Sequence, residues 1–409
     1  MYKMIRWAAL FAAASSAFPQ DLRSVGAPEW TEQRVLDLFQ QQTPMRRESR
    51  AAAAAAVEAV RGRTLWPNPV AGYSRETVGF TEFVTAEQHL PVSGRIRLEK
   101  QAMLPAQQTA EAQGEARIWE ARAQVRAVFY RALQAQEQAR AIGTALSEIE
   151  SIIELLRVRE REGEGSRYDR MRVERETADL RADLALANAR VMSERAVLLA
   201  YLPPKTELGV LTGDLRPRTT TFSREDLLNR ALESRRELRA ESSAIAQLSL
   251  ARQVAERQRI PEPTVFAGLK RTDLGTFHGN GAVVGISIAL PTFNKGQTEV
   301  ARLTAEQQQV AARREGLEQQ ITAATSGAYD VFALKLAALQ AFERETGDSG
   351  AALVTMARAG YQDGELGVLQ LLDAYRLTRL TALRRLELQA AVKDAEIELS
   401  RNAGFEVTQ

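Results

Sequence analysis

The chain has 409 residues, of which 45% are hydrophobic and 26% are charged. Its 54 basic and 52 acidic residues give a formal net charge of +2, which offers no general argument for a nucleic acid or an anionic membrane surface as partner. The chain has no Cys, which excludes disulfides, thiolate metal sites and a lipid-modified Cys.

The first residues, MYKMIRWAALFAAASSA, combine basic residues, an apolar stretch and a small-residue ending. This order is typical of a secretory signal peptide at 1–17, with cleavage expected after Ala17. A buried first helix is the alternative, but Pro19 and Pro28 would break it soon after. No later segment has the roughly 18 consecutive apolar residues of a membrane-spanning helix, so any passage through a membrane would use strands.

Three motifs occur twice in the same order, which indicates an internal duplication. TLWPNPVAG at 64–72 recurs as RIPEPTVFAG at 259–268, HLPVSGR at 89–95 as ALPTFNKGQ at 289–297, and EGEGSRYDRM at 162–171 as DGELGVLQLL at 363–372. Each copy predicts a helix, a β-hairpin, a very long helix, a turn and a helix. The predicted segments are a first repeat at 18–205 with its hairpin at 66–91 and turn at 163–168, a linker at 206–222, a second repeat at 223–402 with its hairpin at 261–291 and turn at 361–367, and a tail at 403–409.

The helix before each hairpin has a predicted start and stop. Thr31 or a neighbour caps the first, which runs to about Arg63, and Ser223 with Asp226 caps the second. A Pro-x-Pro pair then ends each helix, because proline lacks the backbone donor and restricts the preceding residue.

The long helices have the strongest periodicity, that of a coiled-coil seam. In the first, the seam residues alternate three and four apart: Ile118, Ala121, Val125, Val128, Ala132, Ala135, Ala139, Ile142, Leu146, Ile149, Ile153 and Leu156. In the second they fall seven apart: Leu303, Val310, Leu317, Ala324, Val331 and Ala338. A helix from about Arg95 to Glu162 would be roughly 100 Å long, which favours a rod of paired helices with hairpins and turns at opposite ends.

The segment GAVVGISIALP at 281–291 alternates large and small residues. Val284, Ile286, Ile288 and Leu290 share one face, and small or polar residues share the other. This alternation is typical of a lipid-facing barrel strand. The alternative is a hairpin that packs on a soluble domain. In lipid, four strands per chain would need further chains to close their open edges.

Taken together, the Pro-x-Pro strand starts, the Leu-Pro junctions and the Gly turns, above all YQDGELGVLQLLDAYR at 361–376, resemble the TolC family of outer-membrane efflux proteins. The resemblance implies a mainly α fold with a small membrane β-barrel. Duplicated coiled-coil helices would form a periplasmic tunnel, and four strands per chain would join a trimeric twelve-stranded barrel. The sequence is most similar to the CzcC-like branch, which pairs with heavy-metal resistance-nodulation-division (RND) pumps.

The resemblance implies a passive exit duct, not an enzyme, in the cell outer membrane and extending into the periplasm. The implied partners are the other copies of a homotrimer, a periplasmic adaptor (membrane fusion protein), an inner-membrane RND pump and outer-membrane lipid; heavy-metal cations are the implied cargo. No nucleic acid and no cofactor are expected. The alternative is a soluble periplasmic coiled-coil adaptor or scaffold, which detergent dependence would distinguish from a duct.

The resemblance also implies site residues at the turn end. Asp373 matches an acid that rings the pore, whereas Gln370 stands where a second acid is expected. Tyr361 and Asp169 match members of a hydrogen-bonded network that closes the mouth, but Leu366 replaces its Arg. The adaptor would contact the turns, at Gly163, Gly165, Ser166, Gly364 and Gly367. The alternatives are an exposed helix-start acid for Asp373 and simple packing for Tyr361.

No catalytic or metal site is expected. His89 and His278 lie in separate hairpins without a nearby second ligand, so neither predicts a metal site. The GEG at 163–165 indicates a turn, because a phosphate loop would lie between a strand and a helix.

Overall fold

The structure is a computed structural model that describes residues 29–76, 80–218, 222–273, 275–347 and 349–408. The signal peptide predicted at 1–17 lies outside these residues. So do parts of the other predicted segments, namely the hairpins at 66–91 and 261–291, the linker at 206–222 and the tail at 403–409.

The described chain is mainly helical with one small sheet, as the sequence predicts. The helices are α1 (Glu32–Gln42), α2 (Pro44–Arg63), α3 (Arg95–Glu162), α4 (Arg167–Leu199), α5 (Arg224–Ser234), α6 (Arg236–Glu256), the 3-10 helix η1 (Arg257–Arg259), α7 (Gln297–Thr346), α8 (Ser349–Gln362) and α9 (Val368–Ala403). The strands are β1 (Val70–Glu76), β2 (Thr81–His89), β3 (Pro263–Asp273) and β4 (His278–Ile288).

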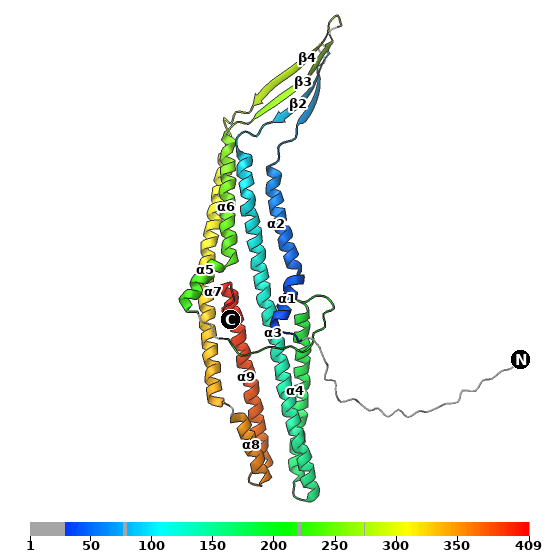
Figure 1. Ribbon diagram of the computed structural model, residues 1–409, viewed down its shortest axis with the longest axis vertical. Helices are drawn as coiled ribbons and strands as arrows, with labels where there is room; N and C mark the ends of the chain where they lie inside the picture. Colours follow the sequence, from blue (N-terminus) through cyan, green and yellow to red (C-terminus); the bar gives the residue numbers. More distant parts are fainter. Residues whose placement is uncertain (1–28, 77–79, 219–221, 274, 348, 409) are drawn as a thin grey trace, which may run out of the picture.

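The molecule is elongated, with the sheet at one end and the α3–α4 and α8–α9 turns at the other (Figure 1). The helix α3 runs through the middle and packs against α2 and α6 toward the sheet and against α4 and α9 toward the turns. On one side of α3, α2 and α4 follow one another along its length. On the other side, α6 and α9 do the same. The helix α7 packs against α6 and α9 and forms the edge opposite α2 and α4.

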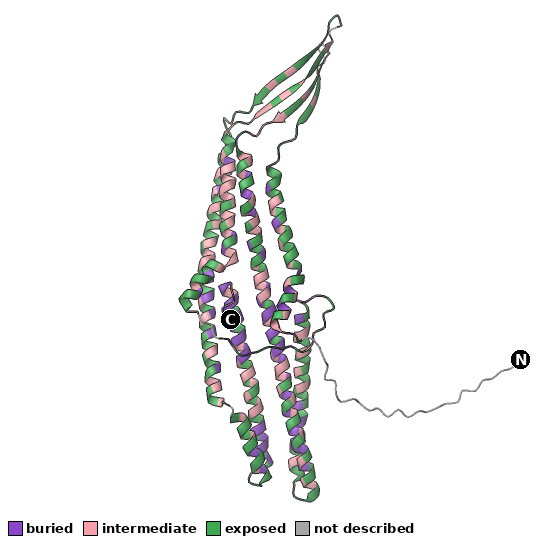
Figure 2. Cartoon of the chain, in the orientation of Figure 1, coloured by how far each residue is buried: buried purple, intermediate pink, exposed green. Residues whose placement is uncertain are grey.

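The helix α3 has the bounds that the sequence predicts, and its 68 residues span roughly 100 Å. Gly94 and Gly163 flank it with φ of 80° and 79°, a backbone region that favours glycine because it has no Cβ. Of the predicted seam residues, only Ile118 and Leu146 are not buried. The apolar stripe of α3 is thus the centre of the helical packing, as Figure 2 shows for the buried residues along its length.

The single helix predicted before each hairpin is wrong, because both are divided in two. Pro44 is the first residue of α2, and it restricts Thr43 to an extended backbone (φ −64°, ψ 129°). Arg235 has nearly the same backbone (φ −65°, ψ 120°) between α5 and α6. The predicted caps are confirmed, since the Thr31 and Ser223 hydroxyls accept hydrogen bonds from the backbone amides of Arg34 and Asp226, the third residues of α1 and α5.

The heptad seam predicted for the second long helix is also wrong in its second half. Leu303 is buried and Val310 and Leu317 are half-buried, but Ala324, Val331 and Ala338 are exposed. The buried residues further along α7 are Ile321, Thr325, Ala328, Phe332 and Leu339. A straight helix drifts by about 20° per heptad relative to a seven-residue repeat, so the heptad positions rotate out of the interface. The helix also ends at Thr346, before Gly347.

The sheet is antiparallel throughout, in the order β1-β2-β3-β4, so the two hairpins pair through β2 and β3. Directly opposed residues share a face, and the register places Val84 opposite Leu269 and Val265 opposite Ile286. The predicted apolar face is confirmed and continues across the sheet: Tyr73, Val84, Leu269, Val284, Ile286 and Ile288 are all at least half exposed. In the single chain, nothing covers this face among the described residues.

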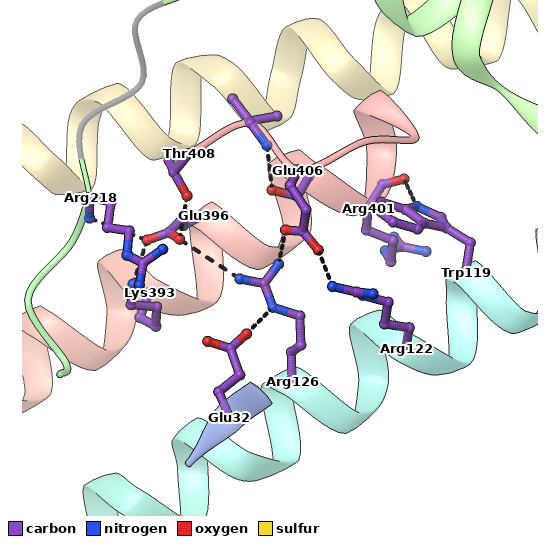
Figure 3. Close-up of polar contacts among 12 residues, drawn as sticks. Glu32, Trp119, Arg122, Arg126, Arg218, Lys393, Glu396, Arg401, Glu406 and Thr408 are labelled. Carbon is purple, nitrogen blue, oxygen red and sulfur yellow. Dashed lines mark hydrogen bonds and ion pairs between the residues drawn. The ribbon is translucent and has the colours of Figure 1, made fainter. Parts of the chain in front are cut away.

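Midway along the rod, a buried group of charged residues joins α1, α3, α9 and the segment after α9 (Figure 3). The Arg126 guanidinium lies 2.5 Å from Glu32 and 2.5 Å from Glu406, and 3.9 Å from Glu396. Glu396 also binds Lys393 at 2.7 Å, and both side chains are only 2% exposed. Burial acts to raise the pKa of Glu32, but Arg126 and the Tyr130 hydroxyl outweigh it, so the pKa lies below its usual value.

Candidate functional site

The two turns at the far end of the rod close by the same backbone hydrogen bonds. In the first, the amides of Glu164 and Gly165 donate to the Arg159 carbonyl at 2.9 and 3.0 Å. In the second, the amides of Glu365 and Leu366 donate to the Gly360 carbonyl at 2.9 and 3.0 Å. Gly163 and Gly364 supply the left-handed residue of each turn, with φ of 79° and 77°.

The helices that follow the turns are capped differently. Ser166 caps α4, since its hydroxyl accepts a hydrogen bond from the Tyr168 amide at 3.1 Å. Gln370 reaches back from α9, and its side-chain oxygen accepts a hydrogen bond from the Gly367 amide at 3.0 Å. Gln370, which stands where the resemblance implies a second pore acid, therefore caps the start of its own helix. Of the predicted turn residues, Gly163, Ser166, Gly364 and Gly367 are exposed and Gly165 is half-buried.

Both turns rest on one apolar core. Its buried members come from α3, α4, α8 and α9: Ile149, Ile152, Ile153, Leu156, Val173, Leu180, Ala357, Tyr361, Val368, Leu371, Leu372, Ala374 and Tyr375. Tyr361 is 8% exposed, and its ring packs within this core. Leu366, which stands where the resemblance implies an Arg, packs against the same core.

Arg159 joins the two turns, and the sequence reasoning missed it. Its guanidinium carbon lies 4.9 Å from the centre of the Tyr361 ring, within the range of a cation–π contact. The guanidinium also donates hydrogen bonds to the carbonyls of Tyr361 and Gln362, at 3.5 and 3.3 Å. The last turn of α3 is thereby held to the last turn of α8. The only sequence signal is the basic run at 157–161, which reads equally well as a solvated helix end.

The structure does not bring Asp169 to Tyr361. Asp169 is half-buried in the first turn of α4, and within the described residues it makes no side-chain hydrogen bond or ion pair. Its neighbour Arg170 instead binds Glu160 at 2.5 Å and Glu174 at 2.7 Å. The hydrogen bonds from Arg170 lower the pKa of both carboxyl groups.

Asp373 is exposed and lines a groove of about 760 Å³ between the first turns of α4 and α9. Gln370 also lines this groove. The charged residues around Asp373 are mostly basic: Arg172, Arg175 and Arg376, with the acid Glu176. Arg376 binds Glu176 at 2.6 Å, and this hydrogen bond, with a smaller contribution from Asp373, raises the pKa of Arg376. The charge of Asp373 is therefore offset by cations in the same groove.

Neither His lies in a metal site. The ring of His89 lies 2.8 Å from a Glu262 oxygen, and that of His278 lies 2.9 Å from an Asp273 oxygen. Across the described ranges, no three His, Asp or Glu side chains are placed to hold a metal ion. In the same ranges, no helix is long and apolar enough to cross a membrane.

No protein-family model and no curated protein matches the sequence. Solved structures do match. CusC superposes with a TM-score of 0.69 at 15% identity, over 95% of this chain and 97% of that chain. The open-state MtrE outer membrane channel of Neisseria gonorrhoeae gives 0.69 at 18% identity, over 92% and 89% of the two chains. The outer membrane protein VceC of Vibrio cholerae gives 0.67 at 15% identity, over 92% and 96%.

The chain therefore has the fold of TolC-family outer-membrane channels along nearly its whole length. The predicted resemblance is confirmed at the level of the fold. The similarity to the CzcC-like branch stays a prediction.

Proposed function

We propose that the chain is the outer-membrane duct of a tripartite efflux system, a passive exit through the outer membrane and the periplasm. The single observation that carries the proposal is the fold, shared from end to end with outer-membrane channels. The exposed apolar face of the sheet supports it, since an apolar face of this kind suits the lipid-facing side of a barrel. The soluble adaptor or scaffold is the less favoured alternative.

We propose a homotrimer. The outer strands β1 and β4 each have one edge without a partner strand among the described residues, and such edges cannot remain open in lipid. Pairing β4 of one copy with β1 of the next would close a ring. Two chains would give eight strands, a barrel that side chains fill, whereas three would give a lumen wide enough for solutes.

The helical edges favour the same arrangement. On the outer side of α4, the exposed residues include Leu186 at 71% and Met192 at 75%. On the outer side of α7, they include Val331 at 47% and Leu334 at 73%. Ala182, Ala185, Ala189, Gly327 and Ala338 are also exposed on these helices. Small and apolar side chains permit close helix approach, so the α4 edge of one copy would pack on the α7 edge of the next.

The remaining partners follow from the same proposal. A periplasmic adaptor would contact the exposed turns around Gly163, Ser166, Gly364 and Gly367, and an RND pump of the inner membrane would supply the cargo. Heavy-metal cations as cargo, the CzcC-like branch, and repeats at 18–205 and 223–402 that arose by duplication remain proposals from the sequence.

Cell fractionation tests the proposal. We expect the protein to sediment with outer membranes, and to need detergent to stay in solution, because the exposed apolar face of the sheet requires a lipid-like cover. An outer-membrane porin and a soluble periplasmic enzyme serve as fractionation controls. Recovery in the soluble fraction after osmotic shock would instead support the adaptor or scaffold.

We also propose that Arg159 holds the turn end of the duct closed, since it links the two turns of each chain. In Arg159→Gln, the hydrogen bonds and the cation–π contact with Tyr361 are lost, so the mouth should open more readily. Single-channel recording in planar bilayers should show a rise in mean conductance. Arg161→Gln is the matched control, because Arg161 is exposed and donates only to a carbonyl of its own helix. Equal conductance in the two variants would contradict the proposal that Arg159 holds the turn end closed.

A further inference from the structure

Large apolar side chains are exposed where the helices meet the strands. Leu65 and Trp66 lie between α2 and β1, Val92 lies between β2 and α3, and Leu290 and Phe293 lie between β4 and α7. Their exposed fractions are 64%, 62%, 62%, 70% and 92%, respectively. Leu290 extends the alternation of Ile286 and Ile288, so the apolar face of the sheet continues into this region. We call these five residues the collar.

The same level of the molecule carries exposed cations. Two of them, Arg97 and Lys100, lie near the start of α3. Arg257 and Arg259 lie in η1, and Lys295 lies in the connection before α7. Within the described ranges, none of them has a carboxylate partner. The apolar collar therefore borders side chains whose positive charge is not neutralised by the protein.

All but one of the acids at this level are already paired. The pairs are Glu58 with Arg61, Glu99 with Arg63, Glu256 with Arg252, Glu262 with His89 and Arg95, and Glu299 with Arg302. Glu87 of β2 lies opposite Phe266, on the sheet face away from the apolar one. The surface that borders the collar thus has a local excess of positive charge, although the chain as a whole has a formal net charge of only +2.

One pocket brings the two kinds of residue together. A cavity of about 550 Å³ is lined by Arg257 beside Leu290 and Phe293, with His89 and Glu262 on its wall. The Glu262 carboxylate is already bound, by the Ser93 hydroxyl at 2.5 Å, His89 at 2.8 Å and Arg95 at 3.3 Å. The Arg257 guanidinium remains available for an anion, next to apolar side chains that suit an acyl chain.

We propose that the collar and its cations bind anionic phospholipid at the periplasmic surface of the outer membrane. The proposal rests on the proposed function, which places the sheet in lipid and the helices in the periplasm. Lys and Arg near a membrane surface attract anionic headgroups, and Trp with other large apolar residues favours the boundary between headgroups and acyl chains. A single pocket that presents a guanidinium beside Leu290 and Phe293 matches a phosphate attached to acyl chains better than a free phosphate.

The test uses the full-length protein reconstituted into phosphatidylcholine vesicles with traces of spin-labelled lipid. Electron paramagnetic resonance separates lipid in contact with the protein from bulk lipid. We expect spin-labelled phosphatidylglycerol to be enriched about threefold over phosphatidylcholine at low salt, and the enrichment to fall as salt rises. In the triple variant Arg257→Gln, Arg259→Gln, Lys295→Gln, the enrichment should fall to about one. The matched control is a triple Gln variant of Arg161, Arg167 and Arg190, which are exposed on α3 and α4 and have no carboxylate partner. This control should keep the enrichment.

Trp66 is the collar residue whose fluorescence can report contact with lipid. Lipid brominated near the headgroup end of its acyl chains should quench tryptophan fluorescence. Trp66→Phe should lose most of that quenching, since Trp30 is only 4% exposed and Trp119 lies on α3 roughly 35 Å from its sheet end. Inorganic phosphate should compete no better than chloride at equal ionic strength. Equal enrichment in both triple variants, competition by free phosphate, or no quenching at Trp66 would overturn the proposal. Failure to insert into vesicles at all would instead contradict the outer-membrane duct.

Discussion

Replacing Arg126 by Met should destabilise the protein by about 3–5 kcal/mol, because the buried Glu396 and the partly buried Glu32 and Glu406 carboxylates would lose this cation. The measurement is thermal unfolding of the purified protein in detergent, followed by circular dichroism. Arg140→Met is the matched control. Arg140 lies on the same helix but pairs with Glu137 at the surface, where an ion pair contributes about 0–1 kcal/mol.

The same substitution should change the response to acid. The pKa of Glu32 lies below its usual value in the folded protein, so its pairing stabilises the fold above the pKa of the unfolded chain. That stabilisation is lost as the pH falls through the lower, folded pKa. Wild-type stability should therefore decline in this acid range, and the decline should be shallower in Arg126→Met. Parallel acid profiles for the two proteins would show that the charge cluster does not stabilise the fold in this way.

Placing a charge on the helical edge should abolish the trimer. Leu334 on α7 and Met192 on α4 lie at similar levels, roughly 55 and 65 Å from the sheet end of the helices. Leu334→Glu or Met192→Glu would bury three unpaired carboxylates in each trimer, which should weaken assembly by at least ~100-fold. Light scattering in mild detergent should then report monomers, and the helical signal should be kept because both side chains are exposed in the single chain.

Leu104→Glu controls for the added charge. Leu104 is 60% exposed, but it lies on α3, in the middle of the helical layer rather than at its edge. That variant should remain a trimer. Trimers in Leu334→Glu and Met192→Glu would place the contact between copies elsewhere, and a monomeric wild-type protein would reject the homotrimer itself.

Much of the fold could be predicted because its signals are local. Gly94 and Gly163 bound α3 through a backbone region open to glycine, so the helix limits were correct to the residue. The alternation around Val284 and Ile286 gave the apolar face, since the period of a strand is two. The divisions at Thr43 and after Thr346 were missed, although Pro44 at a helix start and Gly347 at a helix end are residues that commonly mark such boundaries.

The candidate site at the turns depends on contacts between residues far apart in the chain, which no local sequence pattern indicates. Arg159 meets Tyr361 only because α3 and α8 end at the same level, and the two residues are 202 positions apart. Arg126 sits in an apolar seam between Val125 and Val128, where the sequence alone does not reveal the acids that neutralise it. The collar and the cations beside it could not be predicted from the sequence either. They lie in separate segments of the chain, and the overall composition is nearly neutral.

The ionic cluster around Arg126 has a consequence for the order of folding. Glu32 and Glu406 bind the same guanidinium although 374 positions separate them in the chain, whereas the α3–α4 and α8–α9 hairpins form from neighbours in sequence. Loop closure over such a distance is slow relative to local pairing. The helical hairpins should therefore form early, and the segment after α9 should dock last, because Glu406 lies 280 positions from Arg126 and Glu32 only 94. Until that segment docks, Arg126 lacks its contact with Glu406, so the charge cluster is complete only once the segment after α9 is in place.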